Sequence, residues 1–465
     1  MFLGREKELK KLNELYEKDG FQFAIMYGRK HVGKTTLISE FVRNKLNIFF
    51  VSQEYDNQTA LAIFSKRIYT FFKLNRVTNF PNWNSAFDFI TEKAKDERII
   101  LVLDEFHYLV NTNKFIPSIL KNLIEHKMKN SKLFLIICGS RISFMDNKIS
   151  SMSTLMKIEP LNFIESSKFV PNYCSLDKII TYSITGGIPY YLQKFSDTRT
   201  IKENVVKEIL NKSSHLYEEP RNLLRQGLRE IFVYNSIIEA IAEGNARIDD
   251  ISTKVDLESE KCSKYLHLLI ELDILKKEPP AGEVENRRSI FRITDNYFKF
   301  WFRFIFNNIE FIEQDCGETL YDNLIEPYLS DYIRKNVFKD VCAEYLKIQN
   351  IDGKLPFIFT KIGGWWGVNH TLKTQLEIDL LALGKDDSAI FCECKWKDEP
   401  IDMLELNKLR VTAEVFKKYS HKIFALFSKM GFTGEVIDES NRLNNIILVD
   451  LEKLFENRFN PEVSR

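Results

Sequence analysis

The sequence predicts an α/β protein built from several domains, and three observations lead to this prediction. The chain has 465 residues, more than one hydrophobic core usually supports, so about two to four domains are expected. Hydrophobic residues make up 44% of the chain, which is enough apolar surface for several cores. Three apolar runs of strand length, at 21–27, 99–103 and 133–138, have the character of strands in a parallel sheet.

The first apolar run ends at a glycine-rich stretch that predicts a phosphate-binding P-loop. Residues 28–35 read Gly-Arg-Lys-His-Val-Gly-Lys-Thr and precede a helix-compatible segment, so strand, loop and helix follow in the required order. Backbone N–H groups of such a loop cradle phosphates, the lysine reaches the β- and γ-phosphates, and the hydroxyl after it ligates Mg²⁺. The sequence therefore predicts a site for ATP and Mg²⁺, to which this loop contributes Gly28, Gly33, Lys34, Thr35 and Thr36, with Thr35 as the metal ligand among them.

The second and third apolar runs end in polar residues that suit the same site. Asp104 would hold Mg²⁺ through water, and Glu105 would polarise the attacking water as general base. Ser140 or Arg141, after the third run, would sense the γ-phosphate. Arg141 could equally pair with a local acid, and a strand that merely happens to end in acids is the alternative for Asp104 and Glu105.

Five segments of the N-terminal part, 2–6, 28–35, 102–105, 138–140 and 185–192, resemble in order the archaeal-type P-loop ATPase family. That family belongs with the STAND and origin-recognition-like AAA+ ATPases. The resemblance implies that Gly4 and Arg5 lie near the adenine, and that the turn containing Pro189 closes a small helical lid over the nucleotide. The family's arginine-containing stretch is represented here by 145–158, which contains no arginine, and this implies slow hydrolysis or reliance on Arg141.

The middle of the chain predicts a winged helix. Helical spacing at 223–242, 248–255 and 258–272 is followed by two strand-like runs around a polar loop. The third helix would enter the DNA major groove and the wing would touch the backbone, although winged helices also serve as rigid protein–protein or interdomain modules. The aromatic segment 295–304 predicts a buried helix. Candidate DNA contacts are Lys261, Lys264, Arg287 and Arg288.

The C-terminal part predicts a hairpin that carries two facing carboxylates. Strands at 377–383 and 389–395 flank a turn centred on Asp386, which puts Asp379 opposite Glu393, with Lys395 on the same face as Glu393. Two facing carboxylates repel unless a cation lies between them, and Mg²⁺ with a nearby ammonium suits phosphodiester hydrolysis. A salt-bridged hairpin is the alternative.

Asp379, Glu393 and Lys395 resemble the active-site signature of the PD-(D/E)xK nuclease superfamily. Segments 363–367 and 393–396 resemble the C-terminal domain of unknown function that the archaeal ATPase family carries, which is itself nuclease-like. The resemblance implies that Asp379 and Glu393 are metal ligands. This chain has Lys339 where the family has the first acid of a pair, so Asp340 or Glu344 would supply a third ligand. The basic helix expected at 403–419 would contact phosphates or form a solvated face.

Composition limits the remaining possibilities. The formal charge is +1, so a nucleic-acid surface must be a local patch. Seven scattered cysteines fit reduced thiols, with Cys392 and Cys394 as small buried residues. No signal peptide or membrane-spanning run is present, so we expect a cytoplasmic protein with no membrane partner.

Together these features predict an α/β multidomain chain in which an ATP-binding and ATP-hydrolysing switch acts on DNA. A P-loop parallel sheet with a helical lid (1–200) would control, through a winged helix and connecting helices (201–335), a metal-dependent, restriction-endonuclease-like α/β domain (336–465). The alternative is an ATP-gated DNA-binding regulator with an inactive nuclease fold. A third possibility is an ATPase that acts on proteins, and assembly into a homo-oligomer stays open.

Overall fold

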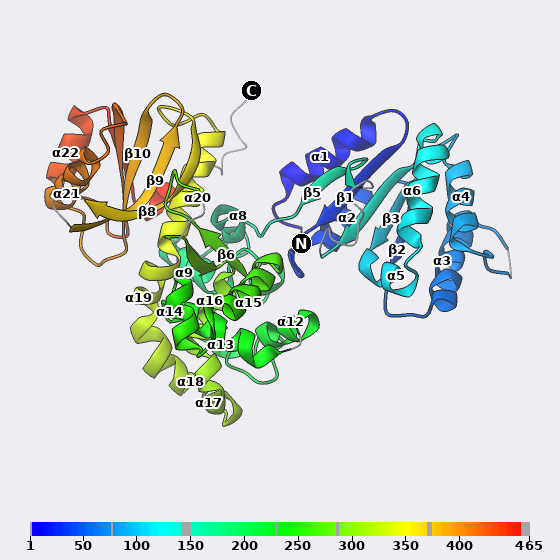
Figure 1. Cartoon of the computed structure of the whole chain (residues 1–465), viewed down its shortest axis with the longest axis horizontal. Helices are drawn as coiled ribbons and strands as arrows, with labels where there is room; N and C mark the ends of the chain where they lie inside the picture. The colour runs from blue at the N-terminus through cyan, green and yellow to red at the C-terminus, as the bar shows by residue number, and fades with distance from the viewer. Residues whose placement is uncertain are drawn as a thin grey trace. The chain divides into compact units, whose positions relative to one another are not determined.

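The computed structural model describes residues 2–75, 78–140, 150–228, 230–284, 288–369 and 374–456. The chain divides into two compact units (Figure 1). Unit 1 comprises Met1–Leu161 and Ile188–Tyr190, and unit 2 comprises Asn162–Gly187 and Tyr191–Arg465. The chain thus returns to unit 1 for three residues.

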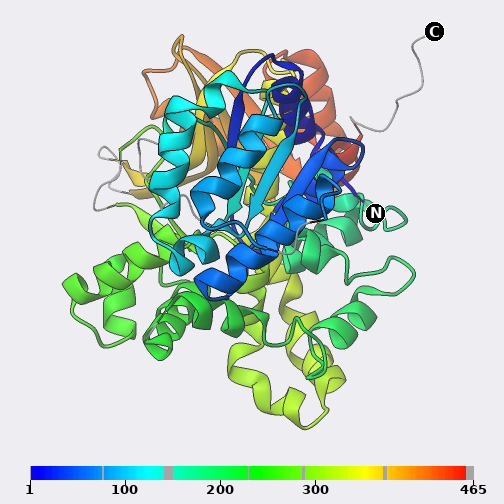
Figure 2. The ribbon, with the colours of Figure 1, turned by 90° about the vertical axis from the view of Figure 1, so that its right-hand side faces the viewer.

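Unit 1 is a five-stranded parallel sheet with helices on both faces (Figure 1 and Figure 2). Alternate side chains of the strands point to opposite faces: Leu135 belongs to the core formed with α3, α4 and α6, whereas the ring of Phe134 packs edge-on against Phe41 of α2 at 5.9 Å. Because both faces are covered, the three central strands β3, β4 and β1 are continuous apolar runs, as the sequence predicted. The strands, in the spatial order β2-β3-β4-β1-β5, are β1 (Gln22–Tyr27), β2 (Asn47–Val51), β3 (Ile100–Asp104), β4 (Phe134–Gly139) and β5 (Thr154–Lys157).

The helices of unit 1 begin where local sequence favours them. Asp56 and Asn82, for example, cap α3 and α4 by accepting backbone N–H groups from the first turn. The aromatic rings of Phe50, Phe64 and Trp83 lie within 6.4 Å of one another and join the sheet to these two helices. The helices are α1 (Glu6–Glu17), α2 (Lys34–Val42), α3 (Asn57–Phe71), α4 (Trp83–Lys93), α5 (Phe106–Thr112) and α6 (Ile116–His126).

Unit 2 begins with helices, and three of them precede a two-stranded antiparallel sheet in the order that the sequence predicted. The prediction of a single helix at 223–242 is wrong, because the backbone of Leu228 is extended and separates two helices there. Glycine at position 227 favours this break. The elements are α8 (Phe163–Ser167), α9 (Ser175–Thr185), α10 (Pro189–Leu192, whose first two residues belong to unit 1), α11 (Ile201–Glu208), α12 (Glu219–Gly227), α13 (Ile231–Ala242), α14 (Ile248–Lys254), α15 (Ser259–Glu271), β6 (Leu275–Glu278) and β7 (Ile290–Ile293).

The aromatic segment forms a buried helix, as predicted. In α16 (Asn296–Phe304) only Arg303 lies outside the buried set, and the indole N–H of Trp301 donates to the carbonyl of Tyr217 at 2.9 Å. The chain then continues through short helices to the C-terminal sheet. These are η2 (Phe306–Asn308), α17 (Ile309–Glu313), α18 (Gly317–Leu320), η3 (Tyr321–Ile325) and α19 (Glu326–Asn336).

The C-terminal part of unit 2 is a mixed five-stranded sheet in the order β12-β11-β10-β9-β8. β8, β9 and β10 pair antiparallel, whereas β10, β11 and β12 pair parallel through crossover helices. The helix expected at 403–419 ends earlier, at Glu414. Cys392 and Cys394 are buried, as expected. The elements are α20 (Phe338–Ile351), β8 (Phe359–Asn369), β9 (Thr374–Gly384), β10 (Ser388–Lys395), α21 (Met403–Glu414), β11 (His421–Ser428), α22 (Gly434–Arg442), β12 (Ile446–Val449) and α23 (Leu451–Phe455).

Among the residues that the structure describes, every helix is too short or too polar to cross a bilayer.

Candidate functional site

The glycine-rich loop joins β1 to α2 at the carboxyl edge of the parallel sheet. Gly28 has to be glycine, because a Cβ there would lie 2.4 Å from the carbonyl oxygen of Ile158. Gly33 precedes α2 with φ 88°, a conformation that glycine adopts without strain. The first N–H groups of a helix have no partner within it, so this loop and the start of α2 form an anion-binding terminus.

The predicted phosphate and magnesium residues of unit 1 come together at this edge. The Lys34 ammonium is buried and donates to the carbonyls of Gly28 and Arg29, at 2.8 and 2.9 Å. The hydroxyl of Thr35 donates to Oδ2 of Asp104, at 2.6 Å, although the two residues lie far apart in the chain. Hydroxyl and carboxylate oxygens are the hard ligands that Mg²⁺ prefers, so these side chains fit the ion. Thr36 lies exposed on the first turn of α2.

Glu105 lies at a sharp turn between β3 and α5. Its φ of 49° is left-handed, and its N–H donates to Oδ1 of Asp104 at 2.8 Å. Burial and the neighbouring Asp104 raise the pKa of the Glu105 carboxyl, which moves it toward the range of a general base at neutral pH. Positive φ in a non-glycine residue is typical of functional sites, where surrounding structure holds the strain.

His107 is a neighbour of Glu105 that the sequence analysis did not single out. Its Nδ1 lies 3.2 Å from Oε2 of Glu105, and its side chain is 13% exposed. Burial, with the positive charges of Lys30 and Lys34, lowers the pKa of the His107 imidazole, which favours its neutral form. No motif in the sequence marks this residue, because its contact with Glu105 depends on the turn at Glu105.

Arg5 supports the loop directly. Its buried guanidinium donates to the carbonyl of Val32 at 2.9 Å and pairs with Glu8 at 3.1 Å. Gly4 and Arg5 both have positive φ, of 74° and 71°, and they precede α1. Arg5 therefore connects the N-terminal segment to the P-loop, a contact that sequence reasoning did not predict.

Pro189 also packs against the loop. Its Cγ lies 3.6 Å from the position that a Cβ on Gly33 would take, and the next residue, Tyr190, stacks on His31 with ring centroids 4.6 Å apart. These contacts explain why Ile188–Tyr190 belongs to unit 1 while its flanks belong to unit 2.

Ser140 follows β4 directly and is half-buried. β4 lies between β3 and β1 in the sheet, and the three strands are parallel, so Ser140 shares the carboxyl edge with Asp104 and the P-loop. Arg141, the other predicted sensor, lies outside the described residues.

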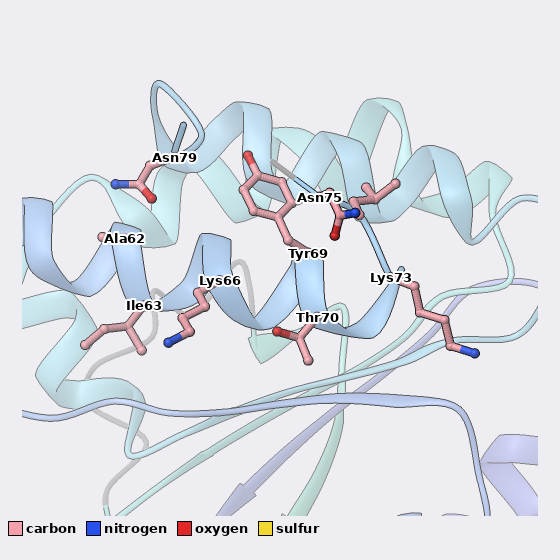
Figure 3. Close-up of a pocket in the computed structure, with 9 residues that line it drawn as sticks. Ala62, Ile63, Lys66, Tyr69, Thr70, Lys73, Asn75 and Asn79 are labelled. Carbon is pink, nitrogen blue, oxygen red and sulfur yellow. The ribbon is translucent and has the colours of Figure 1, made fainter. Parts of the chain in front are cut away.

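A surface hollow of about 650 Å³ on unit 1 is a separate feature (Figure 3). It follows α3 and the segment after it, where Lys66, Tyr69 and Asn79 are among the lining residues. None of the residues that line it belongs to the P-loop or to the carboxylates at the ends of the strands. The hollow is therefore not part of the nucleotide site.

In unit 2, β9 and β10 pair in a register that keeps Asp379 beside Glu393. Leu380 is opposite Cys392, and one further step puts Asp379 opposite Glu393. The backbone N–H of Cys394 donates to Oδ2 of Asp379 at 2.8 Å. Burial, and then the charge of Asp379, raise the pKa of the Glu393 carboxyl.

Lysines neutralise both of these carboxylates. Lys339, on α20, lies 2.5 Å from Oδ1 of Asp379 and 2.9 Å from Glu377. Lys395 pairs with Glu393 and lies 3.5 Å from Glu405. Burial by itself lowers the pKa of Lys339, but the negative charges of Asp379 and Glu377 have a larger effect and raise this pKa. Over the described ranges no three His, Cys, Asp or Glu side chains are grouped as metal ligands, and here lysine ammonium groups contact the carboxylates that a metal ion would use.

The two acids proposed as further ligands are engaged elsewhere. Asp340 accepts from Lys299 at 3.1 Å and from Arg292 at 3.3 Å, and these cations hold the pKa of its half-buried carboxyl well below the usual range. Glu344 accepts from Tyr182 and from the backbone N–H of Phe163. Burial raises its pKa to about 7.

Two of the four predicted DNA-contacting residues take part in local ion pairs. Lys261 and Lys264 are exposed on α15, where Lys264 lies 3.4 Å from Glu260. Arg288 pairs with Glu283 and donates to the carbonyl of Trp366. Arg287 lies outside the described residues.

The parallel sheet, the loop geometry and the Thr35–Asp104 contact define a P-loop ATPase domain. Comparison with known families agrees with this class. Residues 2–195 match a family described as an ATPase domain predominantly from Archaea. Residues 301–412 match a family described as archaeal and bacterial proteins of unknown function.

A relative extends the match over most of the chain. An uncharacterised protein of Methanocaldococcus jannaschii is 33% identical over 410 residues, which cover 86% of this chain and 88% of that protein. Among solved structures, a Walker-type ATPase of Pyrococcus abyssi matches with a TM-score of 0.47, 17% identity and coverage of 65% of this chain and 96% of that one. The Aeropyrum pernix ORC1 protein, solved in complex with DNA, matches with a TM-score of 0.34, 12% identity and coverage of 71% and 95%. This chain belongs to the archaeal ATPase family and is a nucleotide-binding ATPase.

Proposed function

We propose that this protein is an ATP-driven switch that acts on DNA. The observation that carries the ATPase part of the proposal is the contact between Thr35 and Asp104, which joins the P-loop to the strand that ends in the candidate general base. In P-loop ATPases these two positions serve the metal ion and the residue after Asp104 serves the attacking water. Through hydrolysis at this site the chain would alternate between an ATP-bound and an ADP-bound state.

The residues of unit 1 have separate roles in this proposal. Lys34 binds the β- and γ-phosphates, and Glu105 accepts the proton of the attacking water. Thr35 and Asp104 would hold Mg²⁺, whose positive charge would offset the charge developing on the phosphoryl group. Ser140 and Arg141 sense the γ-phosphate. The segments around Gly4, Arg5 and Pro189, which pack on the loop, form the adenine side of the site.

The rest of the chain receives the signal. We assign residues 1–200 to the ATPase domain with its lid, 201–335 to a winged helix with connecting helices, and 336–465 to a PD-(D/E)xK-type domain. The order of α13, α14, α15, β6 and β7 supports the winged helix. Lys261, Lys264, Arg287 and Arg288 are its proposed phosphate contacts.

Two versions of the C-terminal domain follow from the same side chains. In the first, ATP controls a nuclease in which Asp379 and Glu393 hold a metal ion and Lys395 orients the attacking water. In the second, the domain holds DNA without cleaving it. The ion pair between Lys339 and Asp379 favours the second version, because the ammonium supplies the charge that a metal would supply. Displacing a partly buried ammonium leaves charges uncompensated, which is costly.

One experiment tests the switch. Binding of duplex DNA is measured with ATP and with ADP over a salt series, and affinity should differ between the two states by about fivefold or more. In the Lys34→Ala variant this nucleotide dependence should disappear. Absence of DNA binding at every salt concentration would overturn the proposal and favour an ATPase that acts on proteins.

A second experiment separates the two versions of the C-terminal domain. Supercoiled DNA is incubated with the wild-type protein in Mg²⁺ or Mn²⁺, with and without ATP. We expect DNA to be bound and left intact. Cleavage that disappears in Asp379→Ala and Lys395→Ala would establish the nuclease version instead.

A further inference from the structure

The contact between His107 and Glu105 places an imidazole next to the candidate general base. Nδ1 of His107 lies 3.2 Å from Oε2 of Glu105, and both atoms are buried. The ring is at hydrogen-bond distance but not aligned for a complete hydrogen bond. Hydrogen bonds around catalytic groups are commonly poorly aligned in the nucleotide-free state and tighten in the complex.

The backbone of Glu105 creates this contact. Residues two apart on a regular helix do not face each other. Glu105, however, precedes α5 with φ 49° and ψ 44°, so its side chain can approach that of His107, which lies on the first turn of the helix. The His107 ring also lies against that of Tyr108, with centroids 4.0 Å apart, which limits how the imidazole can turn.

We infer that His107 is a positioning residue for ATP hydrolysis, which holds the carboxylate of Glu105 in the orientation that accepts the proton of the attacking water. In that step the water oxygen bonds to the γ-phosphorus, its proton passes to Glu105, and the bond to ADP breaks with its electron pair left on the leaving oxygen. The inference rests on the proposed role of Glu105 as general base. A carboxylate oxygen only accepts hydrogen bonds, so Nδ1 of His107 carries the donated proton.

Orientation of a base affects the chemical step more than nucleotide binding. The side chain of glutamate rotates about several bonds, and a displacement of about 1 Å at a reacting group costs up to about 100-fold in rate. Loss of the orienting donor should therefore lower kcat and leave the affinity for MgATP unchanged. A histidine that served only to stabilise α5 would instead change folding or affinity.

Two substitutions at His107 separate these roles. His107→Phe keeps the ring and removes the donor, and we expect kcat to fall about tenfold or more with the Kd of MgATP within about twofold of wild type. His107→Asn places an amide donor at the position of Nδ1 and should recover most of kcat. His126→Phe makes the same change at an exposed histidine of α6 and should leave kcat unchanged.

Combination with Glu105→Gln completes the test. Glu105→Gln alone should bind MgATP and nearly abolish turnover, and adding His107→Phe should cause no further loss. Three results would each overturn the inference: an unchanged kcat in His107→Phe, equal losses of kcat in His107→Phe and His107→Asn, or an undiminished effect of His107→Phe in the Glu105→Gln background. None of these results would affect the role of Glu105 as general base. Normal turnover by Glu105→Gln would instead overturn the role of Glu105, and the inference with it.

Discussion

The ATPase site and the C-terminal carboxylate pair use the same kinds of residues in opposite ways. In the ATPase site, Lys34 donates to backbone carbonyls, while Asp104 accepts from the neutral hydroxyl of Thr35. In the C-terminal sheet, the ammonium groups of Lys339 and Lys395 bind the carboxylates themselves. In the ATPase site the lysine and the carboxylate do not pair with each other. The lysine can therefore bind an anion, and the carboxylate can bind a cation. The C-terminal arrangement is an already neutralised cluster.

Carboxylates alone therefore do not define a metal site. Asp379 and Glu393 face each other on neighbouring strands, which on its own would favour a cation between them. The cation that the fold provides is an amino group from α20, so the repulsion is relieved within the chain. Four substitutions, in order of decreasing effect, test the two sites and the charged residues of the rest of unit 2.

Lys34→Ala should abolish nucleotide binding. It removes a buried ammonium from the loop, and truncation of such a charged partner lowers affinity by at least about 100-fold. Titration with a fluorescent ATP analogue measures the effect. Lys45→Ala, at a lysine that donates to a carbonyl near the end of α2, serves as a control with normal affinity. Equal affinity in Lys34→Ala and wild type would contradict the assignment of this site.

Lys339→Glu should convert the neutralised cluster into a metal site. It replaces the ammonium beside Asp379 with a third carboxylate, so Mn²⁺ should bind at least about tenfold more tightly than to wild type. Electron paramagnetic resonance of free Mn²⁺, with the P-loop saturated by MgATP, measures this affinity. Lys347→Glu makes the same charge change at an exposed position of α20 and should add no binding. Tight binding by wild-type protein at Asp379 would contradict the comparison.

Glu344→Gln should alter how stability depends on pH. Glu344 joins α20 to Tyr182 and Phe163, and its pKa rises from 4.5 to about 7 on folding. The folded state then binds the proton more tightly, so this carboxyl makes the protein less stable as pH rises from 4.5 to 7, by roughly 3 kcal/mol at most. Urea unfolding at several pH values should show a flatter profile for Glu344→Gln. A profile identical to that of wild type would contradict the raised pKa.

Lys264→Ala should have the smallest effect, on DNA affinity. An exposed lysine that contacts one phosphate contributes about 0.9 to the slope of log affinity against log salt concentration. We therefore expect a weaker affinity and a slope lower by about that amount, measured by fluorescence anisotropy. Lys66→Ala, in the hollow on α3, should change neither quantity. An unchanged slope in Lys264→Ala would remove α15 from the proposed DNA surface.

Features that depend on residues close together in the sequence could be predicted from the sequence. The P-loop occupies consecutive positions, and the pairing of β9 with β10 follows from the length of the turn between them. The burial of α16 follows from its aromatic residues. The split of the helix expected at 223–242 was missed, because helical spacing of apolar residues continues across Leu228 although the backbone does not.

The parallel sheet of the ATPase domain, the phosphate-binding loop and the strand register of the carboxylates could be predicted from the sequence, because each rests on local spacing. Which charges meet depends instead on tertiary packing. Lys339 reaches Asp379 from a separate helix, Arg5 reaches the carbonyl of Val32, and His107 approaches Glu105 through a left-handed turn. Such contacts depend on how elements pack, which the spacing of residues along one element does not encode.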